Sequence, residues 1–209
     1  MGKKVFLVVL FFLIFSKGVA QDRKTHWVDS VLRTLNTHEK VGQLFMIPVS
    51  AYTSEEELSE LQDIINKYKP GGILLTAGGP RSVAQLNNFA QTNSDVPVLT
   101  AISGEWGLGH TLDSVMQFQH ALVLSSIRAD ALVEQAGSEV AREMKLLGIH
   151  LNFGINADIH IEKQSYPTSL RYFGDNPARV AAKSLLFFKG MKQGGALVAA
   201  IHPAGGILN

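Results

Sequence analysis

Two hydrophobic patterns alternate along the chain. Short, almost wholly apolar runs predict buried strands, at residues 41–49, 71–77, 96–103, 148–156 and 196–203. Between them, apolar residues recur every three or four positions and predict helices, at residues 54–68, 80–93, about 128–147 and from Pro177 to the glycines at 194 and 195. Continuous apolar strands separated by helices are typical of a parallel sheet in an α/β protein covered on both sides.

Local signals set the predicted helix ends. Ser54 followed by Glu57 is the pattern of a capping box, and Pro70 ends the same helix. Thr37 is expected to cap one short turn before the first strand. In the helix at 128–147, Leu132 and Val133 are expected to face the core. No low-complexity linker divides the chain, so we expect one domain, built either as an open doubly wound sheet or as a (β/α)8 barrel.

The first twenty residues have the layout of a secretory signal. Lys3 and Lys4 precede an apolar run at residues 5–15, and Gly18 and Ala20 are small enough to admit a signal peptidase. We therefore predict a signal peptide at 1–20, a domain at 21–209, and a secreted or periplasmic location. An uncleaved membrane anchor is the alternative, although the run is short for a bilayer span. The chain has no cysteine, so no disulfide framework is expected.

Charge and motif spacing exclude several functions. The formal net charge is +1, so no basic excess indicates nucleic acid as a partner. His150 and His160 are ten residues apart, which is not a metal-ligand spacing, and no dinucleotide or phosphate-loop fingerprint is present. We expect no metal, no cofactor and, after signal cleavage, no membrane partner.

The polar residues with chemical potential follow the predicted strands. Ser103, Glu105 and Trp106 come after the third strand, in a glycine-rich turn. A carboxylate there can accept hydrogen bonds from sugar hydroxyls or act as an acid or base, and an indole can stack on a sugar face. The alternatives are that Glu105 binds loop amides and that Trp106 packs the loop.

Further candidates follow the later strands. Asp158 ends the fourth strand and either binds a ligand or caps the next loop, and His160 is close to it in sequence. Arg171 lies in a long irregular connection, where it either binds hydroxyls or pairs with Asp158 or Asp175. His202, at the end of the fifth strand, either binds substrate or bonds a neighbouring carbonyl.

Residues 27–200 resemble the N-terminal catalytic domain of the family 3 glycoside hydrolases, and most of all its secreted, Bacteroidetes-type β-N-acetylhexosaminidase branch. The motifs are "HWVDSVLRTLNTHEKVGQLFMI", "KPGGILLTAGGP", "VPVLTAISGEWGLG", "REMKLLGIHLNFGINADI" and "RYFGDNPARVAAKSLLFFKGMKQGG". The resemblance implies an α/β fold of the (β/α)8 barrel type, of which about five βα units are present. It also implies retaining hydrolysis of a β-linked hexosamine or glucose, by an aspartate nucleophile and a histidine acid paired with an aspartate.

The family pattern is kept at some positions and replaced at others. Arg171, His202, Asp158 and Glu105 match its substrate-binding residues. Ser103 stands where the family has a sugar-gripping aspartate, Thr111 where it has an arginine, and Ile201 where it has a lysine.

The resemblance also places the catalytic pair beyond residue 209. We therefore expect an incomplete barrel with no catalytic residue and no turnover by this chain alone. A non-catalytic carbohydrate-binding pseudoenzyme and a truncated fragment are the alternatives. Because a barrel removes its edges only by closing, five strands also predict self-association through open sheet edges.

Overall fold

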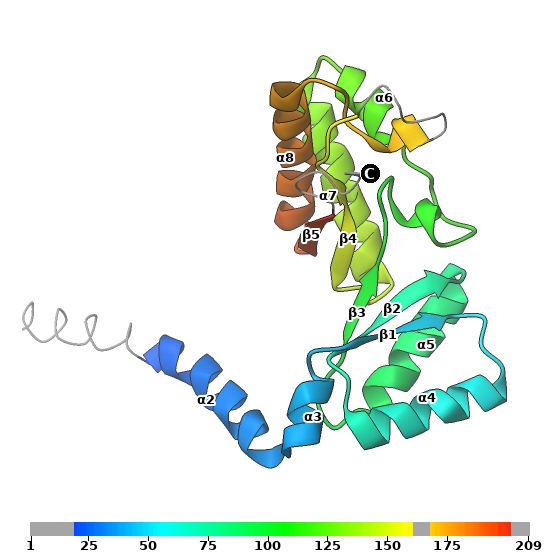
Figure 1. The fold of residues 1–209 in the computed structure, drawn as a ribbon, viewed down its shortest axis with the longest axis vertical. Helices are drawn as coiled ribbons and strands as arrows, with labels where there is room; N and C mark the ends of the chain where they lie inside the picture. Colours follow the sequence, from blue (N-terminus) through cyan, green and yellow to red (C-terminus); the bar gives the residue numbers. More distant parts are fainter. Residues whose placement is uncertain (1–18, 161–167, 202–209) are drawn as a thin grey trace, which may run out of the picture.

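The computed structural model describes residues 19–160 and 168–201, with the backbone alone at 19–25 and 168–169. The predicted signal peptide therefore lies outside the described residues except for its last two, Val19 and Ala20, which begin helix α2 (Val19–Thr34). His202 also lies outside them. The ribbon of α2 runs away from the body of the molecule (Figure 1).

Five parallel strands form the sheet. They are β1 (Met46–Ser50), β2 (Gly72–Ala77), β3 (Leu99–Ile102), β4 (Leu151–Asn156) and β5 (Leu197–Ile201), and they pair in the order β1-β2-β3-β4-β5. Sequential order belongs to the barrel type, whereas a doubly wound sheet changes direction at a central strand. The predicted α/β fold of the (β/α)8 barrel type is confirmed, with five parallel strands, the first four of which are followed by a helix in the described residues.

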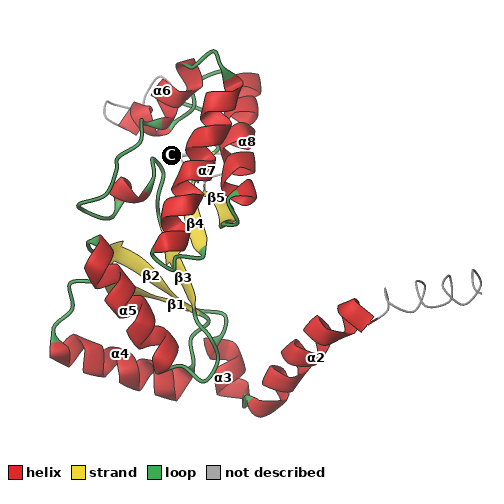
Figure 2. Cartoon of the chain, turned by 180° about the vertical axis from the view of Figure 1, so that it is seen from behind, coloured by secondary structure: helices red, strands yellow, loops and turns green. Residues whose placement is uncertain are grey.

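The helices follow the strands along the chain. They are α3 (Thr37–Gly42), α4 (Glu55–Tyr68), α5 (Pro80–Thr92), α6 (Ala121–Ser126), α7 (Asp130–Leu146) and α8 (Pro177–Gln193), with short 3-10 turns η1 (Leu108–His110) and η2 (Thr168–Arg171). α5, α7 and α8 lie on the same side of the sheet, the side turned to the viewer in Figure 2. In the described part of the chain, these three helices all cover one side, which differs from the expected cover by helices on both sides.

The core fills the space between the sheet and these helices. In β2, Ile73 and Leu75 are buried, whereas Thr76 is exposed, as the alternation of a strand requires. The buried helical residues that join this core include Val83, Leu86, Val133, Val140, Met144, Phe187 and Met191. The layer between helices and sheet is therefore a continuous apolar core.

Three details of the sequence reading are wrong. The apolar run 41–49 is not one strand, because α3 extends to Gly42 and β1 begins at Met46, which leaves Leu44 and Phe45 exposed. Asn36, not Thr37, caps α3, since its side chain accepts the Glu39 amide at 3.1 Å and asparagine is the better N-cap. Leu132 faces solvent, 52% exposed, while Val133 is buried. The Ser54–Glu57 capping box of α4 is confirmed.

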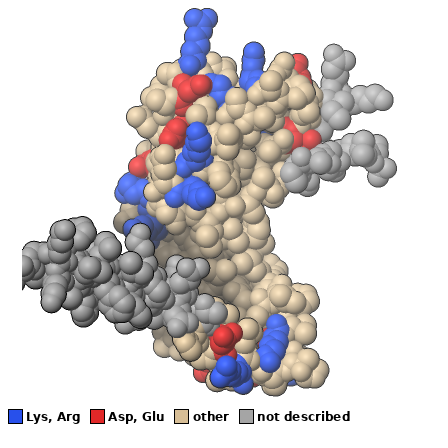
Figure 3. All heavy atoms as spheres, turned by 90° about the vertical axis from the view of Figure 1, so that its left-hand side faces the viewer, with Lys and Arg blue, Asp and Glu red and all other residues tan. Residues whose placement is uncertain are grey.

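The described surface carries charges of both signs. On the face in Figure 3, basic and acidic side chains are interspersed in the upper part, and the middle of the face is uncharged. Among residues 19–160 and 168–201, no helix has both the length and the apolar content needed to cross a membrane.

Candidate functional site

A buried amide fixes the loop that leaves β3. The Asn152 side chain of β4 accepts a hydrogen bond from the Gly104 N–H at 2.8 Å and donates one to the Gly104 carbonyl at 3.1 Å. Asn152 is fully buried, and Gly154 allows the close approach, since a Cβ there would lie 2.4 Å from the Gly104 carbonyl oxygen. The residue after Gly104 is therefore held at the carboxyl edge of the sheet.

That residue, Glu105, forms a two-pronged ion pair with Arg171. The Arg171 Nε–H donates to Glu105 Oε2 at 2.8 Å, and its Nη2 donates to Oε1. The Glu105 side chain is only 3% exposed, whereas that of Arg171 is 40% exposed. The hydrogen bond that Arg171 donates to Glu105 is the main reason that the pKa of Arg171 is raised. In this pair the Glu105 carboxylate is therefore buried, while the Arg171 guanidinium is partly exposed to solvent.

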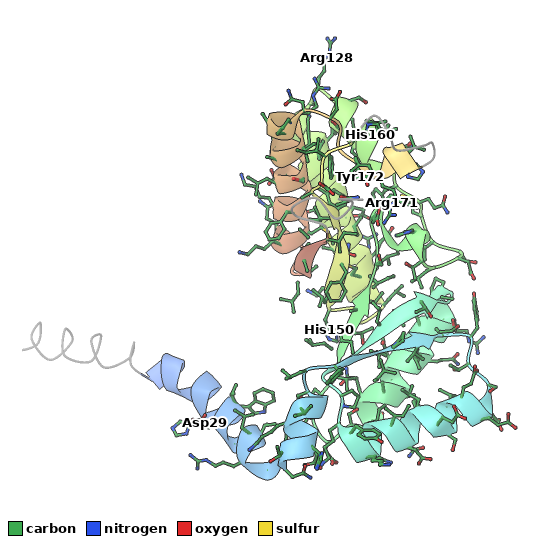
Figure 4. All side chains as sticks on the ribbon, viewed as in Figure 1. Asp29, Arg128, His150, His160, Arg171 and Tyr172 are labelled. Carbon is green, nitrogen blue, oxygen red and sulfur yellow. The ribbon has the colours of Figure 1, made fainter. Side chains whose placement is uncertain are left out.

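A guanidinium held in this way can still bind a ligand. Arginine has five N–H donors, and the two bonds to Glu105 use two of them. The remaining donors of a partly exposed guanidinium suit hydroxyl or carbonyl oxygens. Figure 4 shows Arg171 beside Tyr172 in the upper part of the molecule, near His160.

Aromatic rings surround the turn after Glu105. The Trp106 ring contacts His110 at 4.0 Å and His120 at 4.4 Å between ring centroids. His110 Nδ1 accepts the Glu105 amide at 3.4 Å. Burial is the main reason that the pKa of His110 is lowered. The indole is therefore packed between two imidazoles, which supports the loop-packing alternative for Trp106.

The hydroxyls of Ser103 and Thr111 both donate hydrogen bonds to backbone carbonyls. Thr111 Oγ1 donates to the Ser103 carbonyl at 2.6 Å, and Ser103 Oγ donates to the Phe153 carbonyl at 3.4 Å. Both hydroxyls therefore help to shape the turn.

The other predicted site residues make local contacts. Asp158 Oδ1 accepts the Ile159 amide at 2.9 Å, which is the loop-capping role given above as its alternative. His160 donates its amide to the Gly174 carbonyl at 2.9 Å and meets Tyr172 edge to face.

Of the four predicted substrate-binding residues, the structure joins Glu105 and Arg171. Arg171 pairs with Glu105, and not with Asp158 or Asp175 as the alternative had it. His202 stays a prediction.

Three site residues were missed by sequence reasoning: Asn152, His110 and His120. His110 lies five residues after Glu105 in the same glycine-rich turn, a signal that could have been used. Within the part of the chain that the structure describes, no group of three or more histidine, aspartate or glutamate side chains could hold a metal ion.

Comparisons with known proteins agree with this architecture. A family model described as "Glycosyl hydrolase family 3 N terminal domain" matches residues 36–206. A "Beta-N-acetylglucosaminidase/beta-glucosidase" from Cellulomonas fimi is 27% identical over 87% of this chain and 32% of its own length.

Solved structures share the fold. A "Beta-glucoside phosphorylase BglX bound to 2FGlc" superposes with a TM-score of 0.76 at 20% identity, over 85% of this chain and 32% of that one. A family 3 β-N-acetylglucosaminidase from Paenibacillus sp. str. FPU-7 gives 0.68 at 25% identity, over 80% and 33%. The chain thus spans about a third of the length of these relatives.

Proposed function

The chain belongs to the family of glycosyl hydrolase family 3 N-terminal domains, and from this membership we propose that its strand ends recognise a terminal β-linked hexosamine or glucose unit. The observation that carries the proposal is the Glu105–Arg171 pair at the end of β3. A cation oriented by a buried carboxylate is a fixed hydrogen-bond donor for sugar hydroxyls or an acetamido carbonyl. The curated relative from Cellulomonas is named for action on both of these sugars.

We also propose that residues 1–209 bind this sugar without cleaving it. Retaining hydrolysis by the mechanism that the resemblance implies needs a carboxylate that is free to attack the sugar, with a histidine as the acid. Both oxygens of Glu105 are bonded to Arg171, and Asp158 accepts a loop amide. These two carboxylates are therefore assigned to structure and binding rather than to hydrolysis.

The test measures binding and cleavage on the same sample. N-acetylglucosamine or glucose should give saturable binding in calorimetry at millimolar concentrations, and Arg171→Gln should weaken it at least tenfold. An aryl β-N-acetylglucosaminide should release no aryl alcohol above a heat-killed blank. Absence of saturable binding contradicts recognition, and aryl release contradicts the non-catalytic assignment.

Export is a separate proposal. The basic and apolar pattern of residues 1–20 supports cleavage near Ala20 and a secreted or periplasmic location. N-terminal sequencing of the chain expressed in a bacterial host with a periplasm tests it, and a mature protein that begins at Met1 contradicts it.

Self-association is proposed from the sheet edges. β1 and β5 are the outermost of the five described strands, and an unpaired strand edge offers amide and carbonyl groups to another chain. Light scattering after size-exclusion chromatography should give a mass above that of one chain, and a strictly monomeric mass contradicts the proposal.

A further inference from the structure

We propose that His110 is a positioning residue: its neutral imidazole holds the Glu105 backbone where the carboxylate pairs with Arg171, and protonation of the ring releases the pair. The consequence for sugar binding rests on the proposed function above. The geometric part of the proposal stands without any ligand.

The contact that carries the inference is between a ring nitrogen and a backbone amide. His110 Nδ1 accepts the Glu105 N–H at 3.4 Å. A neutral imidazole has one acceptor nitrogen and one donor nitrogen, so this contact requires the tautomer with its proton on Nε2. The Trp106 ring lies against the imidazole, with 4.0 Å between ring centroids and an angle of 39° between the planes, and limits its rotation. The protonation state of His110 is therefore coupled directly to the position of the Glu105 backbone.

Charged groups from several segments act on this ring. Burial opposes the imidazolium most strongly and lowers the pKa of His110 below its ordinary value of 6.5. Glu105 and the Ser103 backbone favour the imidazolium, and Arg171 and His120 oppose it.

Helix α7 packs against η1 and brings ionisable side chains to this turn. Arg142 and Glu143 line a small cavity with Leu108, and they are not among the groups that act on His110. Besides burial and the Ser103 backbone, the groups that act on the ring are therefore the two members of the ion pair and His120.

Protonation reverses the role of Nδ1. A proton from solvent binds this nitrogen, so an N–H donor now faces the Glu105 amide donor, and the hydrogen bond is lost. At the same time a cation appears beside Arg171 and competes for the Glu105 carboxylate. Both effects loosen the Glu105–Arg171 pair, so the Arg171 guanidinium becomes mobile below the pKa of His110.

The experiment follows the Arg171 Nε–H signal by nuclear magnetic resonance in the 209-residue chain without ligand. This signal reports the bond to Glu105 directly. In the natural chain it should change with pH in step with the ring signals of His110, at a midpoint below 6.5. His110→Asn keeps an acceptor in the place of Nδ1 but cannot be protonated, so the bonded signal should persist through the same pH range.

Matched variants separate positioning from packing. His110→Leu removes the acceptor and should give the unbonded signal at every pH, with a spectrum that otherwise remains dispersed. His120→Asn removes the other imidazole that contacts Trp106, which opposes the His110 cation, so the titration should remain with its midpoint moved to higher pH. An Arg171 signal that ignores pH in the natural chain, or one that still titrates in His110→Asn, overturns the proposal.

Sugar binding is measured separately in the same variants. If the proposed function holds, affinity for N-acetylglucosamine should fall about tenfold in the natural chain below the His110 pKa but not in His110→Asn. If no variant binds sugar while the ligand-free titration behaves as described, recognition fails and the positioning role of His110 survives.

Discussion

Replacing Asn152 by leucine should destabilise the protein through two backbone groups. Leucine has the same number of side-chain heavy atoms, branched at the same carbon, but cannot bond the Gly104 N–H and carbonyl, which Asn152 now satisfies at 2.8 and 3.1 Å. A buried backbone group left without a partner costs about 1–3 kcal/mol, so two cost about 2–6 kcal/mol. Burial of the added apolar surface stabilises the protein by about 1–2 kcal/mol, so the free energy of unfolding should fall by about 3 kcal/mol.

Urea unfolding followed by circular dichroism measures this loss. With a slope of about 2–3 kcal/mol per molar urea, the midpoint should fall by about 1–1.5 M. Asn88 lies exposed on α5, so the matched control Asn88→Leu should change the free energy of unfolding by less than about 0.5 kcal/mol. The reasoning is refuted if Asn152→Leu costs less than about 1 kcal/mol or no more than the control.

Three further predictions concern the pair, the histidine and the helix contact. Arg171→Gln leaves the Glu105 carboxylate buried without its cation and should cost about 1–3 kcal/mol in urea unfolding, part of which the double variant with Glu105→Gln should recover. Because the pKa of His110 is lowered in the folded state, the unfolded chain takes up its proton first, and stability should fall as pH drops below 6.5. Melting curves between about pH 7 and pH 5 should therefore show a smaller loss in His110→Asn than in the natural chain, and equal losses contradict the assignment. Gly190→Ala places a Cβ 1.9 Å from the Glu134 carbonyl oxygen and should lower the melting temperature by several degrees, so an unchanged value would rule out this close contact between α7 and α8.

The strand–helix alternation could be predicted from the sequence because local signals mark the ends of the helices and the spacing of apolar residues marks their buried faces. The capping box at Ser54 and Glu57 is a local signal, and so is the burial of Val83 and Leu86 on one face of α5. The start of β1 could not be read, since residues 41–49 are too uniformly apolar to show a period. Leu132 and Val133 show the same limit, because neighbouring apolar residues compete for one core position.

The sequence predicted that the candidate site lies at the carboxyl edge of the sheet, but it did not predict which side chains contact one another there. Parallel strands bring their carboxyl ends together, so Glu105 and Arg171 could be expected near each other. Their pairing joins residues 66 positions apart and depends on where the turn after β3 is fixed. Asn152 sets that position through a buried hydrogen bond and His110 through a partly buried one, and neither leaves a periodic pattern in the sequence.

The claim that the strand ends recognise a sugar is tested most directly by mapping a titration with N-acetylglucosamine on the two-dimensional spectrum of the 209-residue chain. The account predicts saturable changes at the Arg171 Nε–H and the Trp106 indole N–H, while the indole of Trp27, exposed on α2 away from this edge, stays unchanged. No change at Arg171 at saturating sugar, or changes confined to other parts of the molecule, would contradict it.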